Sequence, residues 1–144
     1  EANWQVIKLS EKGNEQTSPI DGIPSTLPAL PQAQAIQSRA ALAGFDWENI
    51  DGVLSKVSEE LSELTKTQSA EDRESEFGDL LFSVVNAGRW MGLDAESALR
   101  KTDARFRKRY REMERLSAKK GTTLNQLNLE EKDFLWEQAK SIVG

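Results

Sequence analysis

The amino-acid sequence predicts an all-α fold built from antiparallel helical hairpins, and three observations lead to it. Apolar residues recur at helical spacing in several long stretches, as Ile50, Val53 and Val57 do. These stretches are bounded by residues that begin or end helices, such as Asn128 and Gly121. No segment alternates apolar and polar residues as a half-buried strand does. We expect the helices to form a core like that of a four-helix bundle.

The chain has 144 residues, a length that suits one domain with its own core. We expect residues 1–26 to be an extended N-terminal segment and residues 27–144 to be the helical core. The first residue is Glu rather than Met, so we also expect this domain to be excised from a longer chain.

The N-terminal part is the least regular in pattern. Residues 4–12 suit a short helix or strand, and residues 14–28, rich in Pro and Gly, suit an extended linker. A helix is predicted to begin at residues 27–31 and to run to Ala43, because Gly44 is a typical C-terminal stop. In the connection that follows, we expect the rings of Phe45 and Trp47 to fill the core.

Residues 49–92 are predicted to form a helical hairpin. The first helix spans about residues 49–66, and Ser69 is a suitable N-cap for the second, which Gly92 ends. The predicted buried stripe of the first helix consists of Ile50, Val53, Leu54, Val57, Leu61 and Leu64. The second helix is apolar around most of its circumference, so we expect a partner subunit to cover it in a homodimer.

Two further helices are predicted after the hairpin. Asp94 is expected to cap the first, which runs to about residue 120 and carries the apolar residues Ala98, Phe106, Tyr110, Met113 and Leu116. Residues 100–120 contain ten Lys or Arg and only three acids, so this helix is strongly basic. Residues 121–128 are predicted to be a loop. The last helix is expected over residues 129–143, with Phe134, Trp136 and Ile142.

Acidic residues gather on both sides of the predicted hairpin turn. Glu59, Glu60 and Glu63 precede it, and Glu76 and Asp79 follow it. Residues three apart share a helix face, and residues equally far from the turn lie level in an antiparallel pair. Glu60 is therefore expected opposite Asp79, and Glu63 opposite Glu76. Such crowded carboxylates repel one another unless a cation lies among them. The alternative is a solvated acidic face, and the position of Glu60 at the edge of the buried stripe favours the cation.

The composition restricts the chemistry further. The chain has no cysteine and no histidine, which excludes thiolate or imidazole zinc sites and catalytic triads that need these residues. A metal must then be held by oxygen ligands, which favours Mg²⁺, with Mn²⁺ as a substitute. The net charge of −5 argues against nucleic-acid binding by the basic helix. The sequence has no membrane-span or signal-peptide pattern. Because the lack of cysteine fits a reducing compartment, we expect a cytoplasmic protein.

Taken together, these segments resemble the MazG family of nucleoside triphosphate pyrophosphohydrolases. The sequences EELSE at residues 59–63 and EFGD at 76–79 are similar to the EExxE and ExxD motifs of that family. GFDW at 44–47, GDLLF at 78–82 and RFRKR at 105–109 also match family segments in the same order. The resemblance covers about residues 4–140 and is to the C-terminal one of the two tandem domains of bacterial MazG in particular.

The resemblance implies hydrolysis of a nucleoside triphosphate to the monophosphate and pyrophosphate by a homodimer. It implies Mg²⁺ bound by Glu60, Glu63, Glu76 and Asp79. From this we predict a mechanism in which Glu59 or Glu63 orients or deprotonates the attacking water. It also implies substrate binding by Arg105, Arg109, Trp136 and Lys140. This sequence departs from the family pattern at Asp103, where Asn is expected, and at Arg105, where Lys is usual.

Other interpretations of the same residues remain. The substrate could be dUTP, dCTP or phosphoribosyl-ATP, because the base pocket cannot be identified from the sequence. The chain could instead be a helical assembly module whose acidic site binds metal without turnover. Arg105 and Arg109 could simply be solvated, or could pair with Glu112 and Glu114 along their helix. Trp136 could be a core residue.

Overall fold

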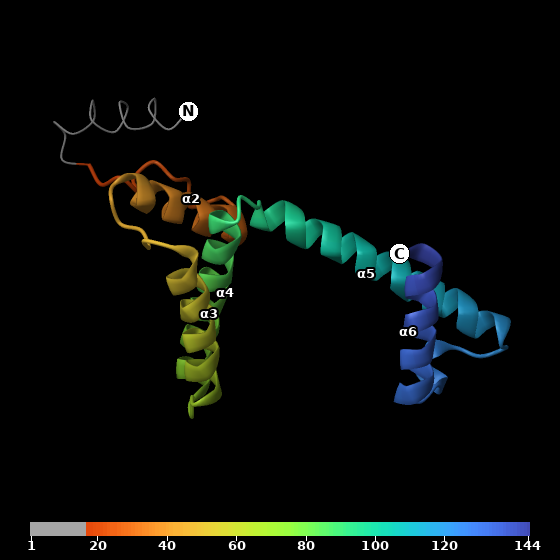
Figure 1. Ribbon diagram of the computed structural model, residues 1–144. Coiled ribbons are helices and arrows are strands. Elements are labelled where there is room, and N and C mark those ends of the chain that lie inside the picture. The colour runs from red at the N-terminus through yellow and green to blue at the C-terminus, as the bar shows by residue number, and fades with distance from the viewer. Residues whose placement is uncertain (1–16) are drawn as a thin grey trace. The chain divides into compact units, whose positions relative to one another are not determined.

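The computed structural model describes residues 17–144, so the expectation for residues 4–12 lies outside the described residues. All regular secondary structure within residues 17–144 is helical, which confirms the all-α fold class. The elements are α2 (Ala29–Leu42), α3 (Ile50–Thr65), α4 (Ala70–Trp90), α5 (Ala95–Lys119), the short 3₁₀-helix η2 (Leu124–Gln126) and α6 (Leu129–Val143) (Figure 1). The predicted loop over residues 121–128 therefore contains one 3₁₀ turn.

The helix ends follow the local chemistry of the sequence. The Ser69 side chain accepts a hydrogen bond from the backbone N–H of Asp72 at 3.1 Å, which caps α4 as predicted. Asn128 caps α6 in a capping box with Glu131. Gly44, after α2, has a φ of +97°, a left-handed conformation that glycine adopts without a Cβ clash.

Within the described residues, the chain divides into two compact units, one that ends at Glu96 and one that spans residues 97–144, and the boundary lies in the first turn of α5. Each unit has its own buried residues and is described by itself. The expectation of a single domain over residues 1–144 stays a prediction.

The first unit is organised around the hairpin of α3 and α4, which run side by side in opposite directions (Figure 1). α2 packs against α4. Val53 of α3 is 1% exposed, and Val85 and Ala87 of α4 are also buried. The Gln37 side chain donates a hydrogen bond to the backbone carbonyl of Phe82 at 2.8 Å, which fixes α2 to α4.

Part of the predicted buried stripe is not covered within the single chain. Leu54 and Leu61 are 43% and 52% exposed, because they lie on the side of α3 that α4 does not cover. The apolar residues of α4 are also only partly covered within the chain, with Phe77, Leu81, Phe82 and Val84 all about half exposed. The apolar surface of the hairpin is thus wider than two helices can bury against each other.

The second unit has a core formed by α5, η2 and α6. Met113, Leu124, Leu135 and Ala139 are buried there, and Leu116, Leu127 and Trp136 pack against them. Every helix within residues 17–144 is too short or too polar to cross a lipid bilayer.

Candidate functional site

Three carboxylates from the two arms of the hairpin converge at one place. Oxygen atoms of Glu60 on α3 and of Glu76 and Asp79 on α4 all lie within 4.8 Å of one another. Glu60 is buried, Glu76 is half-buried and Asp79 is exposed, so the group lies at the surface edge of the helix pair. This convergence is what equal spacing from the turn predicts for Glu60 and Asp79.

Within this carboxylate trio, the pKa values of Glu60 and Glu76 shift in opposite directions. Burial raises the pKa of Glu76, and the hydrogen bond and negative charge of Glu60, then the charges of Asp79 and Glu63, raise it further. The pKa of Glu60 is lowered instead, because the Lys56 ammonium lies 2.8 Å from its Oε1 and outweighs the effect of burial. The charged form of Glu76 is therefore disfavoured by its neighbours where no further positive charge is present.

The residues of the trio fit a hard divalent cation. They offer only carboxylate oxygens, the donors that Mg²⁺ and Mn²⁺ prefer. The raised pKa of Glu76 indicates an excess of negative charge that a cation would relieve. The structure therefore supports a divalent-cation site at this position.

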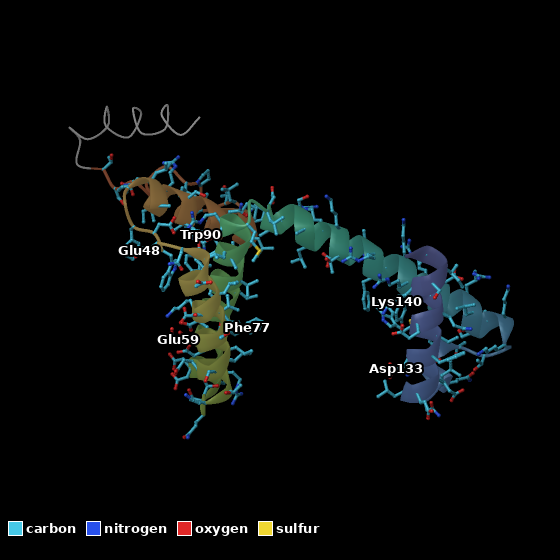
Figure 2. The ribbon with its side chains drawn as sticks, in the orientation of Figure 1. Glu48, Glu59, Phe77, Trp90, Asp133 and Lys140 are labelled. Carbon is cyan, nitrogen blue, oxygen red and sulfur yellow. The ribbon has the colours of Figure 1, made fainter. Side chains whose placement is uncertain are left out.

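The other two predicted acids lie beside the trio. Glu59 is exposed on the outer side of α3, with its carboxylate 3.6 Å from the Lys56 ammonium, and Phe77 lies on the opposite side of the hairpin (Figure 2). Glu63 is exposed one turn nearer the hairpin tip, outside the trio. It borders a shallow hollow of about 370 Å³ that also includes Glu76. Roles for Glu59 and Glu63 stay predictions.

A larger cavity of about 710 Å³ lies between α2, α3, α4 and the connection over residues 43–49. Glu60 and Asp79 of the trio line it, and so does Lys56. The other walls include the aromatic side chains of Trp47 and Phe82 and the amides of Gln37 and Asn86. The cavity of the first unit therefore has both charged and apolar side chains in its walls.

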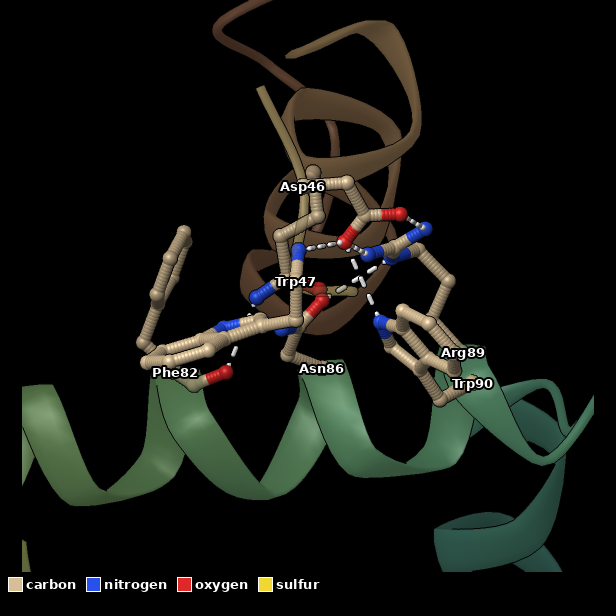
Figure 3. A network of polar contacts seen from close by, with 7 residues as sticks. Asp46, Trp47, Phe82, Asn86, Arg89 and Trp90 are labelled. Atoms are coloured by element: carbon tan, nitrogen blue, oxygen red, sulfur yellow. Dashed lines mark hydrogen bonds and ion pairs between the residues drawn. The ribbon is translucent and has the colours of Figure 1, made fainter. Parts of the chain in front are cut away.

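An ionic network holds the connection against the end of α4 (Figure 3). The Asp46 carboxylate accepts hydrogen bonds from Arg89 at 2.7 and 3.3 Å and from the Trp90 indole N–H at 3.1 Å. Burial raises the pKa of Asp46, but the hydrogen bonds from Arg89, from the backbone of Trp47 and from Trp90 lower it by more. The connection that carries Trp47 is thereby anchored to α4.

The expectation that Phe45 and Trp47 fill the core is wrong. They are 84% and 44% exposed, and both line the cavity. The Trp47 ring lies so close to α3 that a Cβ at Gly52 would be 2.8 Å from its Cε3 atom. The Asp46 anchor and the missing Cβ of Gly52 together place the indole at the cavity wall.

Several residues of this region were not singled out from the sequence. Gln37 contacts Phe82, and Arg89 contacts Asp46, across distant segments of the chain, which leave no local signal, whereas Asn86 and Arg89 contact each other within α4. Lys56 did carry a signal, because a basic residue four positions before Glu60 shares its helix face.

The residues expected to bind substrate lie in the second unit. The Arg109 guanidinium lies over the Trp136 ring, 5.3 Å from its centroid, and the Phe106 ring is 5.4 Å from that of Trp136. Arg109 also donates a hydrogen bond to the carbonyl oxygen of Gly144. Trp136 thus packs on the core and still presents a half-exposed ring beside a cation.

The other two basic residues expected to bind substrate, Arg105 and Lys140, contact residues of their own helices. Arg105 donates to Thr102 at 3.3 Å, and Lys140 pairs with Glu137 at 3.3 Å. Glu112 pairs with Arg115, which lowers the Glu112 pKa more than burial raises it. Within residues 17–144, the expected alternative pairing of Arg105 and Arg109 with Glu112 and Glu114 is not formed.

The fold and the site define an all-α protein with a carboxylate site for a divalent cation beside a cavity. Comparison with known proteins then assigns the family. The chain is 45% identical over 137 residues to the nucleoside triphosphate pyrophosphohydrolase/pyrophosphatase MazG of Thermotoga maritima, a match that covers 95% of this chain. It is 42% identical over 145 residues to a nucleoside triphosphate pyrophosphohydrolase of Escherichia coli, and 41% identical over 143 residues to the uncharacterized protein YabN of Bacillus subtilis. This chain belongs to the MazG family.

The matches cover different shares of these relatives. The chain spans about half the length of the first two, 54% and 55%, and 29% of the Bacillus protein. No family model matches the chain.

Proposed function

We propose that this chain hydrolyses nucleoside triphosphates to nucleoside monophosphate and pyrophosphate with a divalent cation. The observation that carries the proposal is the convergence of Glu60, Glu76 and Asp79 within 4.8 Å at the edge of a cavity. Two relatives that match nearly the whole chain bear the name of this activity.

In this proposal, the acids of the hairpin hold the cation and the basic residues bind the substrate. Glu60, Glu76 and Asp79, joined by Glu63, are the ligands, and Mg²⁺ is the proposed ion, with Mn²⁺ as a substitute. When bound, the cation supplies positive charge to the phosphates and lowers the pKa of a coordinated water. Glu59 or Glu63 orients the attacking water, because the chain has no histidine to act as a base.

The remaining proposed contacts involve the phosphates and the rest of the nucleotide. Arg105, Arg109 and Lys140 offset the negative charge that develops on the phosphates. Trp136 completes the nucleotide site. The contact between Arg109 and Trp136 supports a shared role for α5 and α6 in this binding.

We further propose that the chain acts as a homodimer. The exposed apolar side chains of the hairpin form the surface that a second copy would cover: Leu54, Leu61, Phe77, Leu81 and Val84. Sedimentation of the purified protein tests this, and a monomer at all concentrations would contradict it. A cytoplasmic location stays part of the proposal, because nucleoside triphosphates are found there, and cell fractionation tests it.

The activity is tested by measuring pyrophosphate release from a panel of NTPs and dNTPs, with Mg²⁺ and with EDTA. The panel includes dUTP, dCTP and phosphoribosyl-ATP, which separates the alternative substrates. We expect release that requires Mg²⁺ and that is lost in Glu60→Gln and Asp79→Asn. Glu74→Gln, an exposed acid on α4 outside the trio, is the matched control and should retain activity.

A negative result would also be informative. If the folded wild-type protein gains stability with Mg²⁺ but releases no pyrophosphate from any nucleotide, the hydrolase proposal is wrong. The metal-binding assembly module would then be the better description.

A further inference from the structure

The second unit carries a net charge opposite in sign to that of the whole chain. Residues 97–144 contain twelve Lys or Arg and seven Asp or Glu, a net charge of +5, whereas the whole chain carries −5. The expectation against nucleic-acid binding depended on the net charge of the whole chain, which does not describe this unit. What the unit can bind depends instead on where its positive charges lie.

Most of these positive charges lie on one face of α5. At about 100° per residue, ten residues of α5 fall within a sector of roughly 120° around the helix. All ten are exposed, none is acidic, and the three that are not basic are the small residues Ser97, Ala104 and Ala118. The other seven form the basic face of α5: Arg100, Lys101, Arg107, Lys108, Arg111, Arg115 and Lys119.

The basic face is separate from the residues proposed to bind substrate. Arg109 lies over the Trp136 ring, 5.3 Å from its centroid, and the centre of the basic face is about 140° around α5 from Arg109. Within residues 17–144, the side chains of Arg107 and Arg111 have no hydrogen bond or ion pair. Arg115 has an acidic partner, but its side chain is still 49% exposed. The proposed hydrolase site therefore does not use this surface.

Part of the basic face is a row of cations at constant spacing. Its members are four residues apart, so that their Cα atoms rise by about 6 Å per step: Arg107, Arg111, Arg115 and Lys119. Three of the four are arginines, which bind phosphate oxygens through two parallel N–H groups. The whole face extends over about 28 Å of helix. A row of this kind suits an anion with many regularly repeated charges.

The composition of the face distinguishes between possible partners. An acidic protein would need apolar or aromatic anchors at the centre of the interface, and a nucleic-acid single strand would need aromatic rings for its bases. The face has neither. A membrane would need the apolar side of α5, whose Met113 and Leu116 pack in the core of the second unit. A double-stranded nucleic acid, bound through its phosphates, needs only the positive charges.

The two kinds of duplex differ in how closely a straight helix can approach them. The major groove of B-form DNA is about 12 Å wide and admits an α-helix, whereas the major groove of A-form RNA is too narrow for side chains to read. We propose that the basic face of α5 binds the phosphates of duplex DNA without regard to sequence. At about 3.4 Å per base pair, the face spans roughly eight base pairs. This inference goes beyond the proposed function and does not depend on it.

The test measures DNA binding in EDTA without nucleotide, so that the result is independent of the carboxylate trio. Fluorescence anisotropy of a labelled duplex of about 20 base pairs gives the Kd at salt concentrations from about 50 to 200 mM. Four phosphate contacts should give a slope of about −3.6 for the logarithm of the association constant against that of the salt concentration. In Arg107→Gln/Arg111→Gln, this slope should become shallower by about two, and the Kd at the lowest salt should rise at least about tenfold.

The matched control is Lys120→Gln/Lys132→Gln. It also removes two positive charges from the second unit, but from positions outside the basic face. The control should bind DNA almost as wild type does, and urea unfolding verifies that both double variants are folded. Equal weakening in both double variants would show that only the net charge of the unit matters, and would overturn the proposal.

Three other outcomes would overturn the proposal. Absence of binding to the duplex at the lowest salt, with protein up to about 100 μM, would show that the face is only a solvated surface. Equal or tighter binding of single-stranded DNA or of duplex RNA of the same length would assign the face to a different nucleic acid. Binding to phosphatidylserine vesicles, with none to the DNA duplex, would assign it to a membrane surface.

Discussion

Replacing Asp46 with asparagine removes the charge that holds the 43–49 connection against α4 while keeping the shape of the side chain. Asp46 accepts from two nitrogens of Arg89 and from Trp90, and the side chains of Asp46 and Arg89 are 27% and 17% exposed. Hydrogen bonds to buried charged groups contribute about 1.5–3 kcal/mol, and exposed ion pairs contribute about 0–1 kcal/mol. For this partly exposed network, we expect Asp46→Asn to lower the free energy of unfolding by about 1–2 kcal/mol at pH 7.

The expected pH dependence of this stability difference follows from the direction of the Asp46 pKa shift. The pKa of Asp46 is lower in the folded chain than its ordinary value, so the charged form stabilises the fold. The stability difference between wild type and Asp46→Asn should be fully present above the unfolded pKa of about 4. It should disappear as the pH falls through the lower, folded pKa of Asp46.

Urea unfolding at several pH values measures the difference, and Glu48→Gln is the control. Glu48 is an exposed acid in the same connection, so its neutralisation should change stability little. Equal stability of wild type and Asp46→Asn at pH 7 would refute the anchoring role of the network. A difference that persists in acid would show that the charge of Asp46 is not its cause.

Three further predictions concern the cavity wall, the carboxylate trio and the second core. Gly52→Ala places a Cβ 2.8 Å from the Trp47 ring while gaining up to about 1 kcal/mol of helix propensity, so stability should change by less than about 1 kcal/mol. The indole should move, and an unchanged Trp47 emission maximum would contradict this. Glu76→Gln should raise the melting temperature in EDTA, because the raised pKa means that charged Glu76 destabilises the fold increasingly as the pH rises through its titration. The same variant should lose the stabilisation by Mg²⁺ expected for wild type, and a normal Mg²⁺ response would argue against Glu76 as a ligand. Leu135→Ala, at a side chain that is 1% exposed, should cost about 2–5 kcal/mol in urea unfolding. Leu129→Ala, at 73% exposure, should cost less than about 1 kcal/mol, and similar losses in both would refute the assigned core.

The parts of the fold that the sequence predicted well depend on neighbouring residues. Ser69 and Asn128 cap the helices that follow them, because a cap needs only its own side chain and the next turn of backbone. To predict that Glu60 lies close to Asp79, one must also know the position of the hairpin turn. The polar residues at the turn indicate that position.

The parts that the sequence did not predict depend on contacts between distant segments. Asp46 meets Arg89 43 residues further along the chain, and Gln37 meets Phe82 45 residues further along. Helical periodicity carries no information about such pairs, so the cavity and its amides were missed. Periodicity also marked Leu54 and Leu61 as buried, although it cannot specify whether the same chain or another covers them.

The two separate cores have a consequence for cooperativity. Val53 and Val85 are buried in the first unit, whereas Leu135 and Ala139 are buried in the second. A chain with two cores can melt in two steps, and a single free energy of unfolding then describes neither step. Tryptophans occur in both units, so variants that keep only Trp90 or only Trp136 would report each step by fluorescence. Coincident midpoints would show that the two cores behave as one cooperative unit, and separated midpoints would assign a stability to each.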